Sequence, residues 1–214
     1  MQKDRATGAR LQTWVTILLT TMVMLTSCGR RDPLEHLPTA TVAAVRDGDT
    51  IELSDGRIVR YCGIDTPERG QPWYDSATAL NASFVLGKTV RLEQGNDRID
   101  RYGRMLAFVF VEDRMVNLEL LKAGMAWCYF FDGNLKYGPE MVRATRRAMQ
   151  DKRGMWRRMP AGDEAYYVGS HRGFRFHRPT CRSVGQIKLD DLRRFPARDS
   201  AFYAGYSPCK NCQP

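Results

Sequence analysis

Beyond residue 40 the apolar residues recur in short runs that turn-forming residues separate, a pattern typical of β-strands. Asp55-Gly56 is one such separator and indicates a tight hairpin turn. In the third run Arg60 stands in a row of apolar residues on one face, and a buried arginine is costly unless it meets an anion. We therefore expect Arg60 to lie where that face opens toward a functional site. The alternative is that Arg60 lies at a strand edge and extends its side chain into solvent. The runs predict strands at residues 41–46, 51–53, 58–64, 88–93 and 105–111.

Longer segments with helical periodicity complete the folded part of the chain. Gly87 and Gly124 follow two of them, as is common after helix ends. In the last segment Met141, Ala144 and Ala148 form an apolar stripe that suits packing against a core. The segments predict helices at residues 72–86, 115–122 and 140–152. Five strands interrupted by one helix predict an α+β fold, a small closed β-barrel with about three packed helices.

The first residues have the pattern of an export signal, with a basic start before an apolar run at residues 14–25. This run is shorter than the roughly 20 residues that an apolar helix needs to span a bilayer. The run ends in Leu25-Thr26-Ser27-Cys28, which resembles a bacterial lipobox. We therefore expect a lipoprotein signal peptide at residues 1–27 and a lipid-modified Cys28. An ordinary cleaved signal with a chance cysteine is the alternative.

Charge and length limit the partners and the number of domains. The 214-residue chain has a formal net charge of +9, which falls to +7 when residues 1–27 are removed. This positive balance favours nucleic acid or anionic envelope components and does not choose between them. Residues 28–39 are rich in charge and proline and suit a tether between lipid and fold. The remaining length allows one full core and a small appendage.

Acidic and arginine residues gather in four short motifs between residues 47 and 104. In chain order the motifs are Asp47-Gly48-Asp49-Thr50, Arg60, Asp65-Thr66-Pro67-Glu68 and Asp100-Arg101-Tyr102-Gly103-Arg104. Hard divalent cations prefer carboxylate and carbonyl oxygens, while guanidinium groups grip phosphate oxygens in pairs. Each motif alone is also common in ordinary turns and loops. Their conjunction predicts a site for a phosphodiester.

These motifs resemble the thermonuclease family, the staphylococcal-nuclease-like calcium nucleases built on a five-stranded OB-fold barrel with packed helices. The resemblance covers residues 40–157 and continues beyond the site in Gly124-Met125-Ala126. It implies that the carboxylates of Asp49 and Asp65 and the carbonyl of Thr66 bind Ca²⁺. With so few protein ligands, water and substrate must fill the other positions, so a modest affinity suited to calcium-rich surroundings is expected.

The same resemblance implies the catalytic residues. Glu68 would activate or position the attacking water, and Arg60 and Arg104 would bind the scissile phosphate and stabilise the transition state. None of these residues is replaced by a neutral one, which argues against a binding-only member of the family. Tyr129 suits either nucleotide contact or packing. Asp100 suits a structural role in its turn.

A second group of metal-binding residue types lies near the end of the chain. Its members, with the spacing His-x3-Cys, 27 residues, Cys-x2-Cys, are His177, Cys181, Cys209 and Cys212. The spacing resembles the zinc-binding module of Ada-type DNA repair proteins, with histidine in place of the first cysteine. The resemblance implies a closed structural Zn²⁺ site in a C-terminal module at residues 166–214. Disulfides among the three cysteines are the alternative, because exported thiols meet an oxidising compartment. We expect nuclease activity to depend little on this module unless it also grips substrate.

The sequence thus predicts a calcium-dependent nuclease that hydrolyses DNA, and potentially RNA, outside the cytoplasm. Its partners would be the nucleic-acid substrate and, through acylated Cys28, the lipid bilayer of a bacterial cell envelope, and no protein partner is implied. A non-catalytic envelope lipoprotein that binds nucleic acid or another polyanion is the alternative. Cys62 and Cys128 lie in apolar stretches and are expected to be buried thiols, with a mutual disulfide also open.

Overall fold

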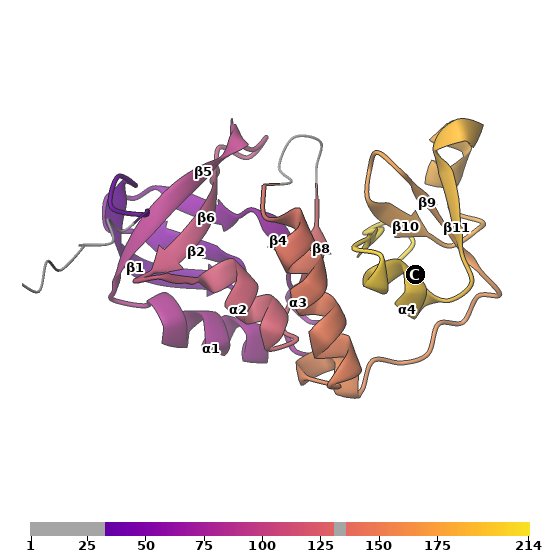
Figure 1. Cartoon of the computed structure of the whole chain (residues 1–214), viewed down its shortest axis with the longest axis horizontal. Coiled ribbons are helices and arrows are strands. Elements are labelled where there is room, and N and C mark those ends of the chain that lie inside the picture. The colour runs from indigo at the N-terminus through magenta and orange to yellow at the C-terminus, as the bar shows by residue number, and fades with distance from the viewer. Residues whose placement is uncertain (1–32, 131–135) are drawn as a thin grey trace, which may run out of the picture. The chain divides into compact units, whose positions relative to one another are not determined.

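Apolar positions from residue 39 onward form the strands of a barrel in the computed structural model (Figure 1), which describes residues 33–130 and 136–214. Cys28 and the predicted signal at residues 1–27 lie outside the described residues. Within the described ranges, no helix is both long and apolar enough to cross a membrane.

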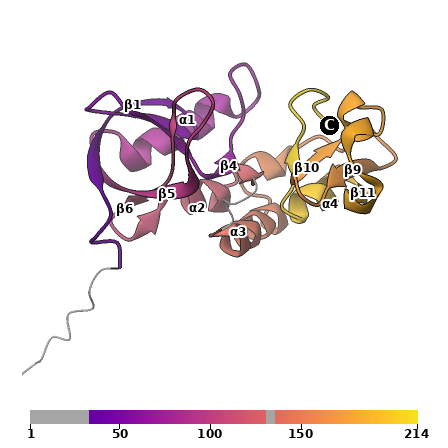
Figure 2. The ribbon, with the colours of Figure 1, turned by 90° about the horizontal axis from the view of Figure 1, so that it is seen from above.

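Five strands close the barrel. Their hydrogen-bonded order is β3-β2-β1-β5-β6, and a parallel pairing between β3 and β6 closes the ring. The short β7 (Arg114–Met115) pairs with the end of β6 in antiparallel direction. Figure 2 shows how strongly the barrel strands curve. The barrel strands are β1 (Thr39–Asp47), β2 (Thr50–Leu53), β3 (Ile58–Tyr61), β5 (Thr89–Ile99) and β6 (Met105–Val111). The predicted closed five-stranded barrel is therefore confirmed.

The prediction of a single strand over residues 58–64 is wrong, because this segment forms two strands. β3 ends at Tyr61, and β4 (Gly63–Asp65) pairs instead with β8 (Trp127–Tyr129). Gly63 has a φ of 76°, and a Cβ there would lie 2.5 Å from the Sδ of Met141. The bend therefore requires glycine, and it ends the row of side chains that starts in β3.

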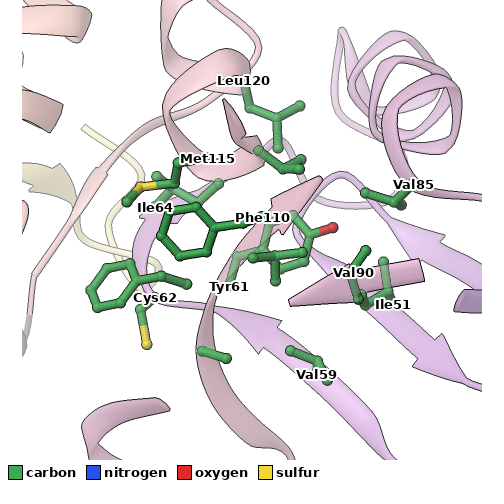
Figure 3. Packing of buried hydrophobic residues seen from close by; sticks show 14 of the residues in the cluster. Ile51, Val59, Tyr61, Cys62, Ile64, Val85, Val90, Phe110, Met115 and Leu120 are labelled. Atoms are coloured by element: carbon green, nitrogen blue, oxygen red, sulfur yellow. The ribbon is translucent and has the colours of Figure 1, made fainter. Parts of the chain in front are cut away.

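The inward faces of the strands share one core. Figure 3 shows the side chains of Tyr61, Ile64 and Phe110 close together, with Val90 beside Ile51. These side chains are at most 5% exposed. The hydroxyl of Tyr61 donates to the Oδ1 of Asn81 at 2.9 Å, so its burial leaves no unpaired donor.

Three helices cover the barrel close to the predicted positions. They are α1 (Tyr74–Val85), α2 (Val116–Lys122) and α3 (Gly138–Gln150). The buried Asn117 of α2 accepts from the backbone N–H of Val109 and donates to the carbonyl of Cys62, at 3.0 and 2.8 Å. The predicted stripe of α3 is buried, with Met141 at 0% exposure. The hydrogen bond to Cys62 anchors the residue just before β4, which carries Asp65.

The C-terminal module contains a four-stranded sheet of order β11-β9-β10-β12. Its own core consists of buried aromatic and small residues, and Trp127 and Trp156 pack against that core. The ring of Phe202 lies 6.1 Å from that of Trp127 and 5.1 Å from that of Trp156. Residues 33–214 therefore form one compact unit. The elements of this part are η1 (Gly154–Arg157), β9 (Tyr167–Ser170), β10 (Arg175–His177), η2 (Arg182–Gln186), η3 (Leu189–Asp191), β11 (Leu192–Phe195), α4 (Arg198–Tyr203) and β12 (Ser207–Pro208).

Candidate active site

A pocket of about 1060 Å³ lies where the β1–β2 turn, β3, the segment after β4 and the β5–β6 hairpin meet. The six residues predicted for the barrel site all line this pocket, although they are spread over more than fifty positions of sequence. They are Asp49, Arg60, Asp65, Thr66, Glu68 and Arg104. Closure of the barrel is what brings these motifs together, since β3 pairs with both β2 and β6.

Arg60 joins the two buried carboxylates of the pocket. Its Nε lies 3.0 Å from the Oδ1 of Asp49, and its Nη2 lies 2.7 Å from the Oδ1 of Asp65. Its Nη1 donates to the carbonyl oxygens of Tyr61 and Ile64. The residue is 7% exposed. The expectation that Arg60 meets an anion is confirmed, and its guanidinium is held at both ends.

The β1–β2 turn holds Asp49 against the segment after β4. The Oδ2 of Asp49 accepts from the backbone N–H and the hydroxyl of Thr66, at 3.0 and 3.1 Å. The Oδ1 of Asp47 accepts from the backbone N–H of Asp49 and fixes the turn. A Cβ on Gly48 would lie 2.7 Å from the Oγ1 of Thr66, so only glycine allows this approach.

Burial and charge act against each other on the two carboxyls. Burial raises the pKa of Asp49 and that of Asp65 above the ordinary aspartate value, and the Arg60 guanidinium lowers both. The negative charge of a neighbouring carboxylate also raises the pKa of each carboxyl. A cation bound at the two carboxylates would offset their burial and mutual repulsion.

Glu68 differs from the two aspartates because it faces solvent. Its side chain is 59% exposed. Its backbone N–H donates to the Oε1 of Gln71 at 2.8 Å, which fixes the chain direction after Pro67. An exposed carboxylate at the rim of the pocket can exchange protons with bulk water.

Arg104 is held by Asp100, which is four residues earlier in the β5–β6 hairpin. The Oδ2 of Asp100 accepts from the Nε and Nη2 of Arg104, both at 2.7 Å. The Oδ1 of Asp100 also accepts from the backbone N–H groups of Tyr102 and Arg104. Asp100 has the structural role expected from sequence, and in addition it orients a candidate catalytic guanidinium.

Comparison with known proteins agrees with this geometry. Residues 58–158 match the family described as Staphylococcal nuclease homologue. The chain is 36% identical to a thermonuclease of Staphylococcus intermedius over 126 residues. This aligned stretch covers 55% of this chain and 75% of that protein.

Proteins named as endonucleases are also similar. An uncharacterized endonuclease of Escherichia coli O157:H7 is 40% identical over 119 residues, covering 54% of this chain and 74% of that protein. An uncharacterized endonuclease of Haemophilus influenzae is 32% identical over 146 residues, covering 66% of this chain and 76% of that protein.

The chain belongs to the staphylococcal nuclease family. This membership identifies it as a nuclease of the hydrolase class. The family match ends at residue 158, so the C-terminal module lies beyond it.

In this nuclease the C-terminal module also lines the pocket, which sequence reasoning missed. Arg175, Lys210 and Asn211 are among the lining residues. The Nζ of Lys210 lies 2.6 Å from the Oε1 of Glu68 and 3.5 Å from the Oδ1 of Asp65. Sequence gave no signal for these contacts, because they join residues about 140 positions apart.

The four predicted zinc ligands come together in the module. One ligand atom from each of His177, Cys181, Cys209 and Cys212 lies within 4.8 Å of the others. In a tetrahedral zinc site with bonds of roughly 2.0–2.3 Å the ligand atoms are separated by about 3.3–3.8 Å. The Nδ1 of His177 is buried and has no hydrogen-bond partner within the described part of the chain. This donor set suits a soft or borderline cation such as zinc.

Cys62 and Cys128 are buried free thiols, as the sequence predicted. Burial raises the pKa of each thiol to about 12. The Sγ of Cys128 lies 3.3 Å from the Oγ1 of Thr145. Neither thiol is ionised at neutral pH, which indicates a packing role.

Proposed function

We propose that this chain is a calcium-dependent nuclease that hydrolyses phosphodiester bonds of DNA, with RNA as a further substrate, outside the cytoplasm. The observation that carries the proposal is one pocket lined by two buried carboxylates, an exposed glutamate and two arginines. A phosphate gains negative charge as water attacks it, and fixed positive groups stabilise that charge.

Calcium suits the donors that this pocket offers. The Asp49 and Asp65 carboxylates and the Thr66 carbonyl are oxygen ligands, which hard cations prefer. The two carboxylates are 5% and 4% exposed, and together with Glu68 they carry three negative charges against the two positive charges of Arg60 and Lys210. When bound, calcium would supply positive charge that polarises the phosphate.

The remaining roles fall to side chains whose positions are fixed. Arg60 and Arg104 are each held by carboxylates and so bind phosphate oxygens with little loss of freedom. Glu68 accepts a proton from the attacking water, whose oxygen forms a bond to phosphorus. The bond from phosphorus to the departing oxygen breaks, and that oxygen takes a proton from solvent.

The proposed nuclease is tested by incubating the purified full-length chain with supercoiled plasmid, with calcium and without it. We expect cleavage with added calcium and none when calcium is omitted. Asp65→Asn, which keeps the shape of a proposed calcium ligand and removes its charge, should cleave poorly and bind calcium weakly. Binding of the plasmid without cleavage at any calcium concentration would instead support the non-catalytic polyanion-binding alternative.

The metal of the C-terminal module is proposed to be zinc with a structural role. The unpartnered Nδ1 of His177 and the three nearby thiols support this assignment. With four protein ligands the site is closed to water. Elemental analysis should find about one zinc per chain. Mass-mapped disulfides among Cys181, Cys209 and Cys212, with no zinc, would contradict it.

Attachment to the cell envelope is proposed from the sequence around Cys28. Cys28→Ala should leave an unprocessed precursor, because lipid transfer to that cysteine would no longer occur. Mass spectrometry of the wild-type amino terminus should show a lipid mass on Cys28. An unmodified terminus at another residue would contradict the lipoprotein assignment.

A further inference from the structure

We propose that Lys210 and Arg175 form a phosphate-binding subsite of the nuclease pocket, which holds a backbone phosphate next to the scissile one. The subsite rests on the proposed function, because its ligand is the strand that the pocket cleaves. Both residues belong to the C-terminal module, beyond the part of the chain that matches the nuclease family.

Lys210 reaches the catalytic carboxylates directly. Its Nζ lies 2.6 Å from the Oε1 of Glu68 and 3.5 Å from the Oδ1 of Asp65. An ammonium group has three N–H donors, so Lys210 can keep its ion pair with Glu68 and also donate to a phosphate oxygen. The side chain of Lys210 is half exposed, which leaves room for that second partner.

Arg175 and Lys210 both lie close to the ring of Tyr129. The guanidinium carbon of Arg175 is 4.5 Å from the centre of the Tyr129 ring, and the Nζ of Lys210 is 5.9 Å from it. Arg60 lies 5.9 Å from this centre as well. Within residues 33–130 and 136–214 no carboxylate pairs with Arg175, although it is partly buried. A guanidinium in that position is suited to an anion from outside the chain.

The charge of the pocket depends on these two residues. The described residues that line it include six acidic and six basic side chains, of which the barrel supplies only four of the basic ones. Without the module the pocket would carry two net negative charges and would repel a nucleic-acid backbone. With the module it is balanced, and a bound divalent cation would make it positive.

The metal-ligand cluster fixes both residues of the subsite. Lys210 lies between two of the ligands, Cys209 and Cys212. Arg175 lies two positions before His177 in β10, and β10 pairs in parallel with β12, which leads into Cys209. A metal that joins His177 to Cys209 would therefore hold Lys210 and Arg175 at their places in the pocket.

The subsite is tested with Lys210→Met in the full-length chain, beside Lys188→Met as a control. Lys188 is an exposed lysine of the same module that does not line the nuclease pocket. Binding of a short fluorescein-labelled phosphorothioate DNA, which resists cleavage, is measured by anisotropy with calcium over a series of salt concentrations. Plasmid cleavage and the thermal unfolding midpoint are measured on the same samples.

We expect Lys210→Met to bind about five- to tenfold more weakly than Lys188→Met, with a salt slope smaller by about one. Equal binding and equal slopes for the two variants would overturn the subsite. Faster cleavage by Lys210→Met would also overturn it, because the lysine would then block the site. If the wild type binds but never cleaves, the proposed nuclease function fails, while the binding comparison still decides the subsite.

Discussion

The barrel pocket and the C-terminal module hold their proposed metals by different means. In the barrel, Asp49 and Asp65 are fixed by Arg60 and Thr66, and they lie in the β1–β2 turn and at the end of β4, beside a large core. In the module, the four proposed ligands lie on or beside short elements over a small core, and among the described residues the Nδ1 of His177 has no hydrogen-bond partner. We infer that the barrel site keeps its shape without calcium, whereas the module depends on its metal.

Of the three substitutions that test this comparison, Arg60→Lys has the largest expected effect and would break its barrel side. Lysine keeps the charge but cannot reach two carboxylates and two carbonyls at once. Turnover of plasmid should fall about 10²- to 10³-fold. Arg57→Lys is the control, since among the described residues the guanidinium of Arg57 pairs with Asp55 alone, on the exposed hairpin. Equal turnover of the two variants would show that catalysis does not need the guanidinium group of Arg60.

An intermediate effect is expected for Cys209→Ser, which removes a ligand of the module. Zinc content should fall, amide exchange should rise in β9 and β10, and cleavage should fall about five- to tenfold through loss of Lys210. Cys128→Ser is the control, because serine can keep the contact with Thr145. Unchanged cleavage after zinc loss would show that nuclease activity does not depend on the module, as expected from the sequence alone.

A small effect is expected for Asp100→Asn, which sharpens the account of how the barrel orients its arginines. Asparagine can still accept from the turn backbone, but its amide cannot accept from the guanidinium of Arg104. We expect kcat/KM to fall about three- to tenfold with little loss of stability. Asp55→Asn alters a similar turn and arginine contact in a hairpin away from the pocket. An equal loss of kcat/KM in both variants would show that Asp100 has no special role in orienting Arg104.

The barrel and its site were largely predictable because their signals are local. Short apolar runs and the turns between them predicted the strands. The conjunction of the acidic and arginine motifs, with their resemblance to the thermonuclease family, predicted the site residues, and these line one pocket. The break before Gly63 was not predictable, since it depends on contact with Met141, far along the chain. The meeting of Lys210 with Glu68 was missed for the same reason. Such contacts arise from packing between distant elements, such as Phe202 against Trp127 and Trp156, and no short pattern encodes them.

The most direct test of the central claim, that the barrel pocket is a calcium nuclease site, is a paired measurement on Glu68→Gln. Turnover of plasmid and calcium binding, by titration calorimetry, are measured on the same full-length preparation. Because the change removes the proposed base and none of the proposed calcium ligands, turnover should fall about 10²- to 10⁴-fold while calcium affinity changes little. Near-normal turnover with normal calcium binding would contradict the account.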